Sequence, residues 1–342
     1  MRKRARVIYN PSSGREALKK DMIDILGVFE QAGYETSAFA TTPAPNSARD
    51  EAERAAREGF DLVVAAGGDG TINEVVNGIA GLKRRPKMAI IPAGTTNDYA
   101  RALRIPREDP LAAAKVVLKN QTIKMDIGVA GKNYFVNIAG GGRLTELTYE
   151  VPSNLKTLFG YLAYLVKGAE LLPRIRPFKV DLKYDGDEYV GEASMFFLAL
   201  TNSVGGFEQI VPDASLNDGK FTMIIVKTSN LAEILHLLTL VLNGGKHVND
   251  PRIIYRKVRK VEAKPLEGSR IMINLDGEYG GDAPMTFVNL KQHIETYANL
   301  DAIPDAAVEE EDPDLLEAER KFLAGVQKLP EDQEIQPKEE NK

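Results

Sequence analysis

The spacing of apolar and polar residues divides the chain into two parts with different patterns. Over roughly the first third, short apolar runs alternate with segments whose apolar residues recur every three or four positions, as on one face of a helix. This pattern predicts strands at 4–9, 35–40, 62–66 and 87–91, and helices at 18–32, 44–58 and 72–79. Alternating strands and helices are typical of a parallel sheet with helices on both faces. We therefore expect an α/β domain at the N-terminus.

After about residue 124, strand-like segments follow one another with few helices between them. They are rich in β-branched and aromatic residues and lie at 133–138, 179–184, 193–202, 220–228, 259–263 and 270–275, with helices expected at 155–172 and 231–243. Such spacing favours a mainly antiparallel, β-sandwich-like domain. The default place for a binding site in this arrangement is the cleft between the two domains.

Charge separates a third region. From Pro304 onward the chain has thirteen acidic and five basic residues, a net charge of −8, so the whole-chain charge of −5 leaves +3 for residues 1–303. This acidic, proline-containing stretch is expected to be flexible. The predicted organisation is an α/β domain over 1–124, to which the chain returns at 290–303, a β-rich domain over 125–289, and a tail over 304–342.

Composition excludes several kinds of chemistry. The 342 residues include no cysteine, which excludes disulfides, thiolate nucleophiles and cysteine-ligated metals. The three histidines are far apart in sequence and have no metal-binding spacing. No apolar stretch reaches the 18 or so residues of a membrane span, and the N-terminus has no signal-peptide core. We expect a cytoplasmic protein.

The most informative local sequence is Gly67 to Thr71 (GGDGT), between an apolar strand and a helical pattern. Glycines let a ligand approach the backbone, and a helix N-terminus offers unpaired N–H groups, so phosphate is the expected ligand. A carboxylate at Asp69 would repel phosphates unless a divalent cation lay between them, which points to Mg²⁺. The alternative is a tight turn in which Asp69 caps the helix.

Two further loops occupy equivalent strand ends, Asn10 to Gly14 and Gly94 to Asp98. In open α/β sheets, ligands bind outside the carboxyl ends of the strands. Three neighbouring loops of small and hydroxyl-bearing residues therefore favour a nucleotide-phosphate site over three unrelated turns. The chain has neither a P-loop, a protein-kinase motif set, nor a nucleophile elbow, and Asn73 stands in place of the third glycine of a dinucleotide-binding fingerprint.

Carboxylates also gather at residues 271–281. If this segment is extended, Ile271, Ile273 and Leu275 share one face, and Asn274, Asp276 and Glu278 lie on the other. Glu278 could then accept a proton from a hydroxyl group. A hairpin turn is the alternative interpretation of the same residues.

Two other segments each have two interpretations. Residues 212–220 carry carboxylates and a glycine, a composition suited either to binding Mg²⁺ or to an ordinary turn. Basic residues alternate with apolar ones at 167–179, which fits either an edge that touches an anionic membrane or a solvated surface. These basic residues are Lys167, Arg174, Arg176 and Lys179.

Taken together, these segments resemble the diacylglycerol kinase catalytic family, and more closely the soluble bacterial diacylglycerol kinases of the B type. The resemblance covers about residues 1–300. GGDG alone is shared with NAD kinases and phosphofructokinases, whereas the later segments favour the lipid kinases. In order, the matching segments are Ile8 to Pro11 with Ser13 and Gly14, Gly67 to Gly78, Pro92 to Asp98, Met125 to Gly128, Leu200 to Ser203, Pro212 to Gly219, and Asp276 to Glu278.

The resemblance implies ATP-dependent phosphorylation of diacylglycerol to phosphatidic acid, a step of membrane phospholipid metabolism. It implies that Glu278 is the general base and that Asp69 organises a catalytic Mg²⁺ through water. It also implies a structural Mg²⁺ held by the Asp218 carboxylate and the backbone carbonyls of Ser215 and Lys220. The residues implied to line the nucleotide site are Asn10, Pro11, Ser12, Ser13, Gly14, Thr41, Gly67, Gly68, Asp69, Gly70, Thr71, Ile72, Asn73 and Thr95.

Several alternatives stay open at this point. Related sphingolipid kinases are thought to use the aspartate of the glycine-rich loop as the base, which would be Asp69 here. Another lipid, such as phosphatidylglycerol or a sphingoid, is an alternative acceptor, NAD is a soluble one, and a non-catalytic nucleotide- or lipid-binding regulator is a further possibility. The partners expected are ATP, diacylglycerol at an anionic membrane surface and a second copy of the chain, with peripheral membrane association and no nucleic acid.

Overall fold

The computed structural model describes residues 2–142, 177–203, 210–228 and 230–309. Residues 1–308 form one compact unit, to which every element named below belongs. The helix expected at 155–172, the basic residues Lys167, Arg174 and Arg176, and nearly all of the acidic tail lie outside the described residues. Among the described residues, no helix is both long and apolar enough to span a bilayer.

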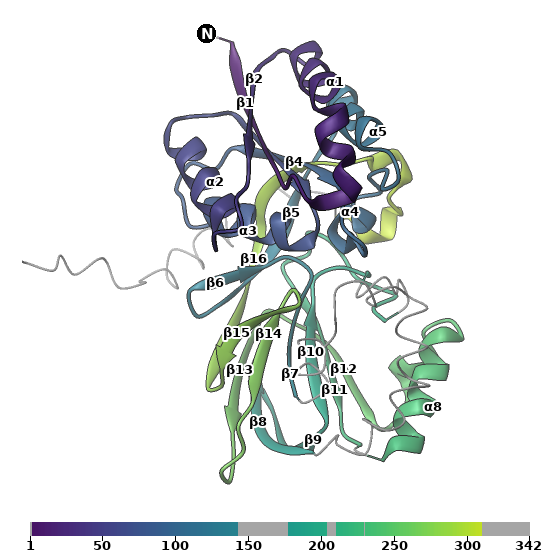
Figure 1. Ribbon diagram of the computed structural model, residues 1–342. Helices are drawn as coiled ribbons and strands as arrows, with labels where there is room; N and C mark the ends of the chain where they lie inside the picture. The colour runs from purple at the N-terminus through teal and green to yellow at the C-terminus, as the bar shows by residue number, and fades with distance from the viewer. Residues whose placement is uncertain (1, 143–176, 204–209, 229, 310–342) are drawn as a thin grey trace, which may run out of the picture. The chain divides into compact units, whose positions relative to one another are not determined.

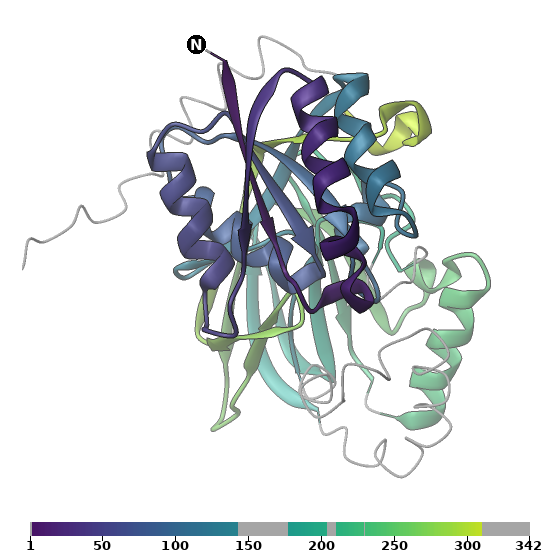
Figure 2. The ribbon, with the colours of Figure 1, turned by 45° about the horizontal axis from the view of Figure 1, so that its top comes forward.

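The first part of the unit is a parallel sheet with helices on both faces. Its strands run in the order β2-β1-β3-β4. Helices α1 and α5 pack together on one face, and α2 and α3 on the other (Figures 1 and 2). The elements are β1 (Lys3–Tyr9), η1 (Ser13–Glu16), α1 (Ala17–Gln31), β2 (Tyr34–Ala40), α2 (Ser47–Arg57), β3 (Leu62–Gly67), α3 (Asp69–Ile79), β4 (Lys87–Pro92), α4 (Asp98–Ala102), α5 (Pro110–Ala114) and η2 (Lys115–Lys119).

The second part is built almost entirely from antiparallel strands. A six-stranded sheet has the order β12-β11-β10-β7-β14-β15, and α8 packs against one face of it through Leu237. The elements are β5 (Thr122–Ala130), β6 (Asn133–Phe135), β7 (Ile138–Gly141), β8 (Phe178–Tyr184), β9 (Asp187–Ala193), β10 (Met195–Ala199), β11 (Phe221–Val226), α8 (Leu231–Leu242), η6 (Lys246–Asn249), β12 (Ile253–Val258), β13 (Lys260–Pro265), β14 (Met272–Leu275), β15 (Glu278–Asp282), β16 (Met285–Tyr297), η7 (Leu300–Ala302) and η8 (Asp305–Ala307).

Strand β16 joins the two parts. It pairs in parallel with β4 at Thr296 and Met88, and antiparallel with β5 and β13. One ten-stranded sheet therefore continues from the α/β part into the β-rich part. The β5–β16 register shifts between Leu290 and Ile294, where Gln292 has a positive φ of 50°.

Aromatic side chains fill the space between the two sheets. Phe135 and Phe287 belong to the ten-stranded sheet, and Phe196 and Phe221 to the six-stranded sheet. The rings of Phe135 and Phe221 stack with centroids 5.5 Å apart, and Phe196 meets Phe287 edge-on at 6.2 Å. Burying one such side chain stabilises the fold by about 2–3 kcal/mol. These rings hold the β-rich part together as a sandwich.

The predicted fold class is confirmed, since a parallel α/β part and an antiparallel β part are both present. The sequence pattern missed β5, β9, β12, β15 and β16. In β16 the polar residues near the register shift interrupt the apolar alternation that signals a strand. The strand predicted at 133–138 is split into β6 and β7, because the N–H groups of Val136 and Asn137 donate to the Asp276 carboxylate instead of to a neighbouring strand.

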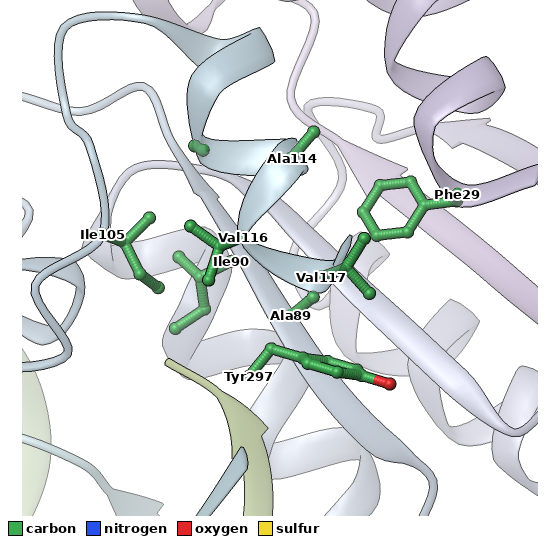
Figure 3. Close-up of a pocket in the computed structure, with 9 residues that line it drawn as sticks. Phe29, Ala89, Ile90, Ile105, Ala114, Val116, Val117 and Tyr297 are labelled. Atoms are coloured by element: carbon green, nitrogen blue, oxygen red, sulfur yellow. The ribbon is translucent and has the colours of Figure 1, made fainter. Parts of the chain in front are cut away.

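The α/β core is closely packed. A cavity of about 10 Å³ lies between α1, β4, β16 and the α5–η2 segment. Figure 3 shows the side chains that line it. Phe29, Ile90 and Val117 line it together with Tyr297, whose hydroxyl is hydrogen-bonded to that of Tyr34 at 2.9 Å. Such a volume holds a single water at most. The cavity is a packing void of the core.

Candidate active site

The three loops predicted to bind phosphate lie side by side at the carboxyl ends of the parallel strands. The backbone N–H of Asn10 donates to Ala66 O at 2.9 Å, and that of Ala93 donates to Gly67 O at 2.8 Å. A Cβ added to Gly94 would lie 2.6 Å from the Cα of Gly68, so these two loops meet backbone to backbone. The fold thus brings together the loops that follow β1, β3 and β4.

Within the first loop, the Asn10 carboxamide accepts hydrogen bonds from both the backbone N–H (3.0 Å) and the hydroxyl (2.8 Å) of Ser12. This Asx turn shapes the loop locally. Thr41 lies close by, since its N–H donates to Tyr9 O at 2.9 Å. Thr95 and Gly70 are exposed, whereas the Ile72 side chain is fully buried in the core and can offer a ligand only its backbone.

Asp69 begins α3 and directs its carboxylate at the loop after β4. One oxygen accepts the Thr96 hydroxyl at 2.7 Å and the Asn97 N–H at 2.9 Å, and the other accepts the Asp98 N–H at 2.9 Å. Burial and the neighbouring charge of Asp98 raise the pKa of Asp69. The carboxylate therefore ties the glycine-rich loop to the next strand end, and a cation nearby would favour its charged form.

Asp98 is a buried acid that was not predicted as a site residue, although it ends the segment Pro92 to Asp98. Its carboxylate accepts the Ser203 hydroxyl at 2.6 Å. Ser203 follows β10 in the β-rich part, so Asp98 links the α/β part to that segment. The contact between Asp69 and Asp98 would have marked Asp98 as a site residue. The sequence does not show this contact, because it forms only in the tertiary fold.

Glu278 lies exposed at the start of β15. The chain reverses direction immediately before it: Leu275 pairs with Glu278, and the two residues between them have positive φ, 51° at Asp276 and 98° at Gly277. Two positive φ values in a two-residue connection are typical of a type I′ hairpin turn. Of the two interpretations of this segment, the hairpin turn is therefore confirmed and the extended strand through Glu278 is not formed. Ile271, Ile273 and Leu275 are all buried.

The Asp276 carboxylate accepts four hydrogen bonds, and its backbone N–H donates to Ile138 O at 2.9 Å. One oxygen accepts the N–H groups of Asn137 (2.8 Å) and Ile138 (2.9 Å), and the other accepts the N–H of Val136 (2.7 Å) and the amide of Asn73 (2.8 Å). Burial raises the pKa of Asp276, and the four donors oppose that rise. Asn73, expected at the nucleotide site, therefore directs its side-chain amide toward the turn that precedes Glu278.

The loop expected to hold a structural metal lies beside another buried acid. Asp218 is buried, and one of its oxygens accepts the Lys220 N–H at 2.9 Å. Asp126 on β5 accepts the N–H of Gly219 at 2.6 Å and that of Gln292 at 2.7 Å. Burial, with the charge of Asp218 adding to it, raises the pKa of Asp126 to about 8. Sequence reasoning did not single out Asp126.

Several oxygens around this loop are buried and have no hydrogen-bond partner: Ser215 Oγ, Asn289 Oδ1 and Gln292 Oε1. Mg²⁺ and its bound waters prefer oxygen ligands of this kind. The described residues contain no group of three or more His, Cys, Asp or Glu side chains close enough to hold a metal. A cation here would depend on Asp218 together with backbone carbonyls, amide oxygens and water.

Known proteins match nearly the whole chain. Family models for the diacylglycerol kinase catalytic domain and for the YegS C-terminal NAD kinase beta sandwich-like domain match residues 4–130 and 147–298. A diacylglycerol kinase of Bacillus subtilis is 56% identical over 85% of this chain and 95% of its own length. A diacylglycerol kinase of Staphylococcus aureus is 49% identical over 90% of this chain and 96% of its own.

The fold is also found among solved structures. Two structures from Bacillus anthracis strain Sterne have TM-scores of 0.75 and 0.67 at 24% and 23% identity. They cover 88% and 87% of this chain and 98% and 97% of their own. At this identity the likeness concerns the fold.

Proposed function

The chain belongs to the diacylglycerol kinase family, and from that membership we propose that it transfers the γ-phosphoryl group of ATP to the free hydroxyl of diacylglycerol, which yields phosphatidic acid and ADP. The structural observation that carries the proposal is the junction at Asp69, where three small-residue loops meet at the strand ends. The choice of lipid rests on relatives at 56% and 49% identity that are diacylglycerol kinases.

The ATP phosphates would lie against the loops at the start of α3. Gly70 is exposed there, and a Cβ at this position would meet no atom within 4 Å, so the backbone is open to a ligand. The unpaired N–H groups and positive end of the α3 dipole favour anionic oxygens. The nucleotide-lining set proposed from the sequence is retained, with Ile72 limited to its backbone and the Asn73 amide directed elsewhere.

Mg²⁺, when bound, neutralises negative charge that develops on the phosphoryl oxygens. Asp69 fits a water-mediated role toward it, because its two oxygens already accept three hydrogen bonds from residues 96–98. The same three bonds argue against Asp69 as the general base, since an oxygen engaged by two donors is poorly placed to take a proton from substrate.

We assign the base role to Glu278. Its carboxylate is exposed, and no described residue donates a hydrogen bond to it, so it can face a lipid hydroxyl. The hydroxyl oxygen forms a bond to the γ-phosphorus, the bond from that phosphorus to the β–γ bridging oxygen breaks, and the hydroxyl proton passes to the Glu278 carboxylate. A positioned base of this kind contributes about 10²–10⁴-fold to the rate.

A second, structural Mg²⁺ is proposed at the loop of Ser215, Asp218 and Lys220. Its support is the buried Asp218 carboxylate and the unpartnered oxygens around Asp126. In such a site the cation would compensate for the negative charge of Asp218 and of the neighbouring Asp126, whose protonation burial otherwise favours.

The remaining expectations are proposals of the same kind. We propose a homodimer that is cytoplasmic and reaches diacylglycerol by peripheral contact with an anionic membrane. We also propose the division into residues 1–124 with 290–303, residues 125–289, and a tail from 304, with the active site between the first two. No nucleic-acid partner is proposed.

The test is transfer of labelled γ-phosphate from ATP with Mg²⁺ to dioleoylglycerol in mixed micelles, beside ceramide, sphingosine, phosphatidylglycerol and NAD. Glu278→Gln is compared with Asp282→Asn, which changes a carboxylate on the same strand that pairs with Arg270. We expect labelled phosphatidic acid from wild type and from Asp282→Asn, and a rate about 100-fold or more lower from Glu278→Gln.

Label on another acceptor would retain the phosphoryl-transfer site and replace the substrate. Label on no acceptor, from protein that is folded and binds ATP, would favour a nucleotide-binding regulator. A fully active Glu278→Gln protein would remove the base assignment.

A further inference from the structure

We propose that Asn73 is a positioning residue, which holds the Glu278 turn against α3 through its hydrogen bond to Asp276. This inference rests on the proposed function, because it concerns the group assigned there as the base. It gives Asn73 a different task from lining the nucleotide site.

The first step of the argument is that helix α3 presents two anchors on one face. Asp69 and Asn73 are four residues apart, and residues at this spacing lie one above the other on a helix. Asp69 is bonded to the loop after β4, and Asn73 to the turn between β14 and β15. A single rigid helix thus contacts both the phosphate loops and the segment that carries the base.

The second step is that the other anchors of the turn come from the hairpin itself and from β7 with the segment before it, none of them from α3. Leu275 pairs with Ala139 on β7, and the Asp276 N–H donates to Ile138 O at 2.9 Å. Asp276 and Gly277 form a two-residue connection, and Glu278 is exposed immediately after it. Within the hairpin, the Asn274 side chain accepts the Gly277 N–H at 2.8 Å. Across the hairpin, Asp276 accepts three consecutive N–H groups of residues 136–138, the backbone segment that joins β6 to β7.

The third step is that, among the described residues, the hydrogen bond from an α3 side chain to Asp276 comes from Asn73. Its amide donates to Asp276 Oδ2 at 2.8 Å and, at a longer 3.3 Å, to Tyr134 O. Asn77, one turn further along, donates to the oxygen of Asn73 and accepts the Tyr134 N–H at 2.8 Å. Asn77 therefore fastens α3 to β6 without touching the turn itself, and it contacts the oxygen of the Asn73 carboxamide rather than the NH₂ group that donates to Asp276.

These contacts make Asn77→Ala a matched control for Asn73→Ala. Both changes remove a partly buried carboxamide from the same helix, and both weaken packing between α3 and β6. Only Asn73→Ala removes the direct contact to Asp276. A general loss of packing would affect both variants alike, whereas a loss of base positioning would affect Asn73→Ala far more.

The experiment measures kcat and the KM for ATP with dioleoylglycerol micelles for wild type, Asn73→Ala, Asn77→Ala, Glu278→Gln and the double variant Asn73→Ala/Glu278→Gln. We expect Asn73→Ala to lower kcat by about 10- to 100-fold, because a displacement of about 1 Å at a reacting group can cost 100-fold. The KM for ATP should stay within about twofold of wild type, and Asn77→Ala should lower kcat by less than about threefold.

The double variant gives the decisive reading. If Asn73 acts through Glu278, its loss has no further effect once Glu278 is gone, so the double variant should match Glu278→Gln. Rates are expressed per ATP-binding site, so that a reduced folded fraction does not count as slower chemistry. If Asn73→Ala is poorly folded, Asn73→Ser replaces it, because a serine hydroxyl is too short to reach Asp276.

Three results would overturn the inference. A kcat for Asn73→Ala equal to that of Asn77→Ala, with Glu278→Gln inactive, removes the positioning role and leaves the base role standing. Multiplied losses in the double variant show that Asn73 acts independently of Glu278. Full activity of Glu278→Gln overturns the base assignment, and the positioning role falls with it.

Discussion

Asp69 and Asp98 are neighbours in space: the carboxylate of Asp69 accepts the backbone N–H of Asp98 at 2.9 Å. The carboxylate of Asp98 in turn accepts a hydrogen bond from the hydroxyl of Ser203, a residue that follows β10 of the six-stranded sheet. The charge of Asp98 is the second cause, after burial, of the raised pKa of Asp69. The two acids form a chain of contacts from the glycine-rich loop to the β-rich part.

Replacing Asp69 with asparagine should abolish most of the activity. Asparagine has one side-chain oxygen where aspartate has two. Its NH₂ group would therefore face a donor that Asp69 now accepts, and the negative charge that favours Mg²⁺ is lost. We expect kcat to fall by about 100-fold or more. Asp109→Asn is the control, because that carboxylate accepts only the first N–H groups of α5, a cap that asparagine also makes. Near-normal turnover of Asp69→Asn would contradict the role assigned to Asp69.

Two glycines of α3 should respond in opposite ways to alanine. At Gly70 a Cβ meets no protein atom within 4 Å, so Gly70→Ala should keep its melting temperature while it weakens ATP binding by about tenfold through contact with the nucleotide. At Gly78 a Cβ would lie 2.3 Å from Arg49 O, so Gly78→Ala should lose about 1–3 kcal/mol of stability. Calorimetric ATP titration and thermal unfolding of both variants check this pair.

If Gly70→Ala binds ATP with the same affinity as wild type, the phosphate site proposed at the start of α3 is wrong. Unchanged stability in Gly78→Ala would instead mean that α2 and α3 separate more easily than their packing indicates.

Mg²⁺ should stabilise the protein through Asp218. A ligand that binds only the folded state at 100 times its Kd adds about 2.7 kcal/mol, so the melting temperature should rise with Mg²⁺ and fall on chelation. Asp218→Asn should remove this rise. Asp213→Asn, an exposed acid of the same loop, should keep it. The site is disproved if Asp218→Asn and wild type gain equally from Mg²⁺.

Acid should destabilise the protein through His293. Burial, with the charge of Arg85 adding to it, lowers the pKa of His293 to about 4, and its Nε2 is 2.8 Å from Ala80 O. The unfolded chain takes up a proton near pH 6.5 and the folded chain does not, so this contribution is complete above pH 6.5 and is lost as the pH falls toward 4.

Between pH 7 and pH 5 the loss from His293 should be about 2 kcal/mol. Denaturant unfolding of wild type and His293→Gln at both pH values measures it, because glutamine keeps a donor for Ala80 O but does not titrate in this range. Equal acid sensitivity of the two proteins would show that His293 is protonated in the folded state.

The fold class followed from local patterns. Strand β3 has the sequence LVVAAG and is buried throughout, as expected of a strand covered by helices on both faces. The placement of three loops at one sheet edge also followed, because parallel strands carry their carboxyl ends to the same side. Strand β16 could not be predicted, because its register shift near Gln292 interrupts the apolar alternation on which strand prediction depends.

At the candidate site the sequence by itself determined residue types and their order: a glycine-rich loop with one acid, a hydroxyl-rich neighbour and a late glutamate. The tertiary structure decided which of these side chains meet. Asp69 is hydrogen-bonded to residues 96–98, Asn73 to Asp276, and Asp126 to Gly219. These bonds join residues that are 27 to 203 positions apart in the sequence. Such contacts arise from chain reversal and sheet pairing, which bring distant residues together and leave no local periodicity in the sequence.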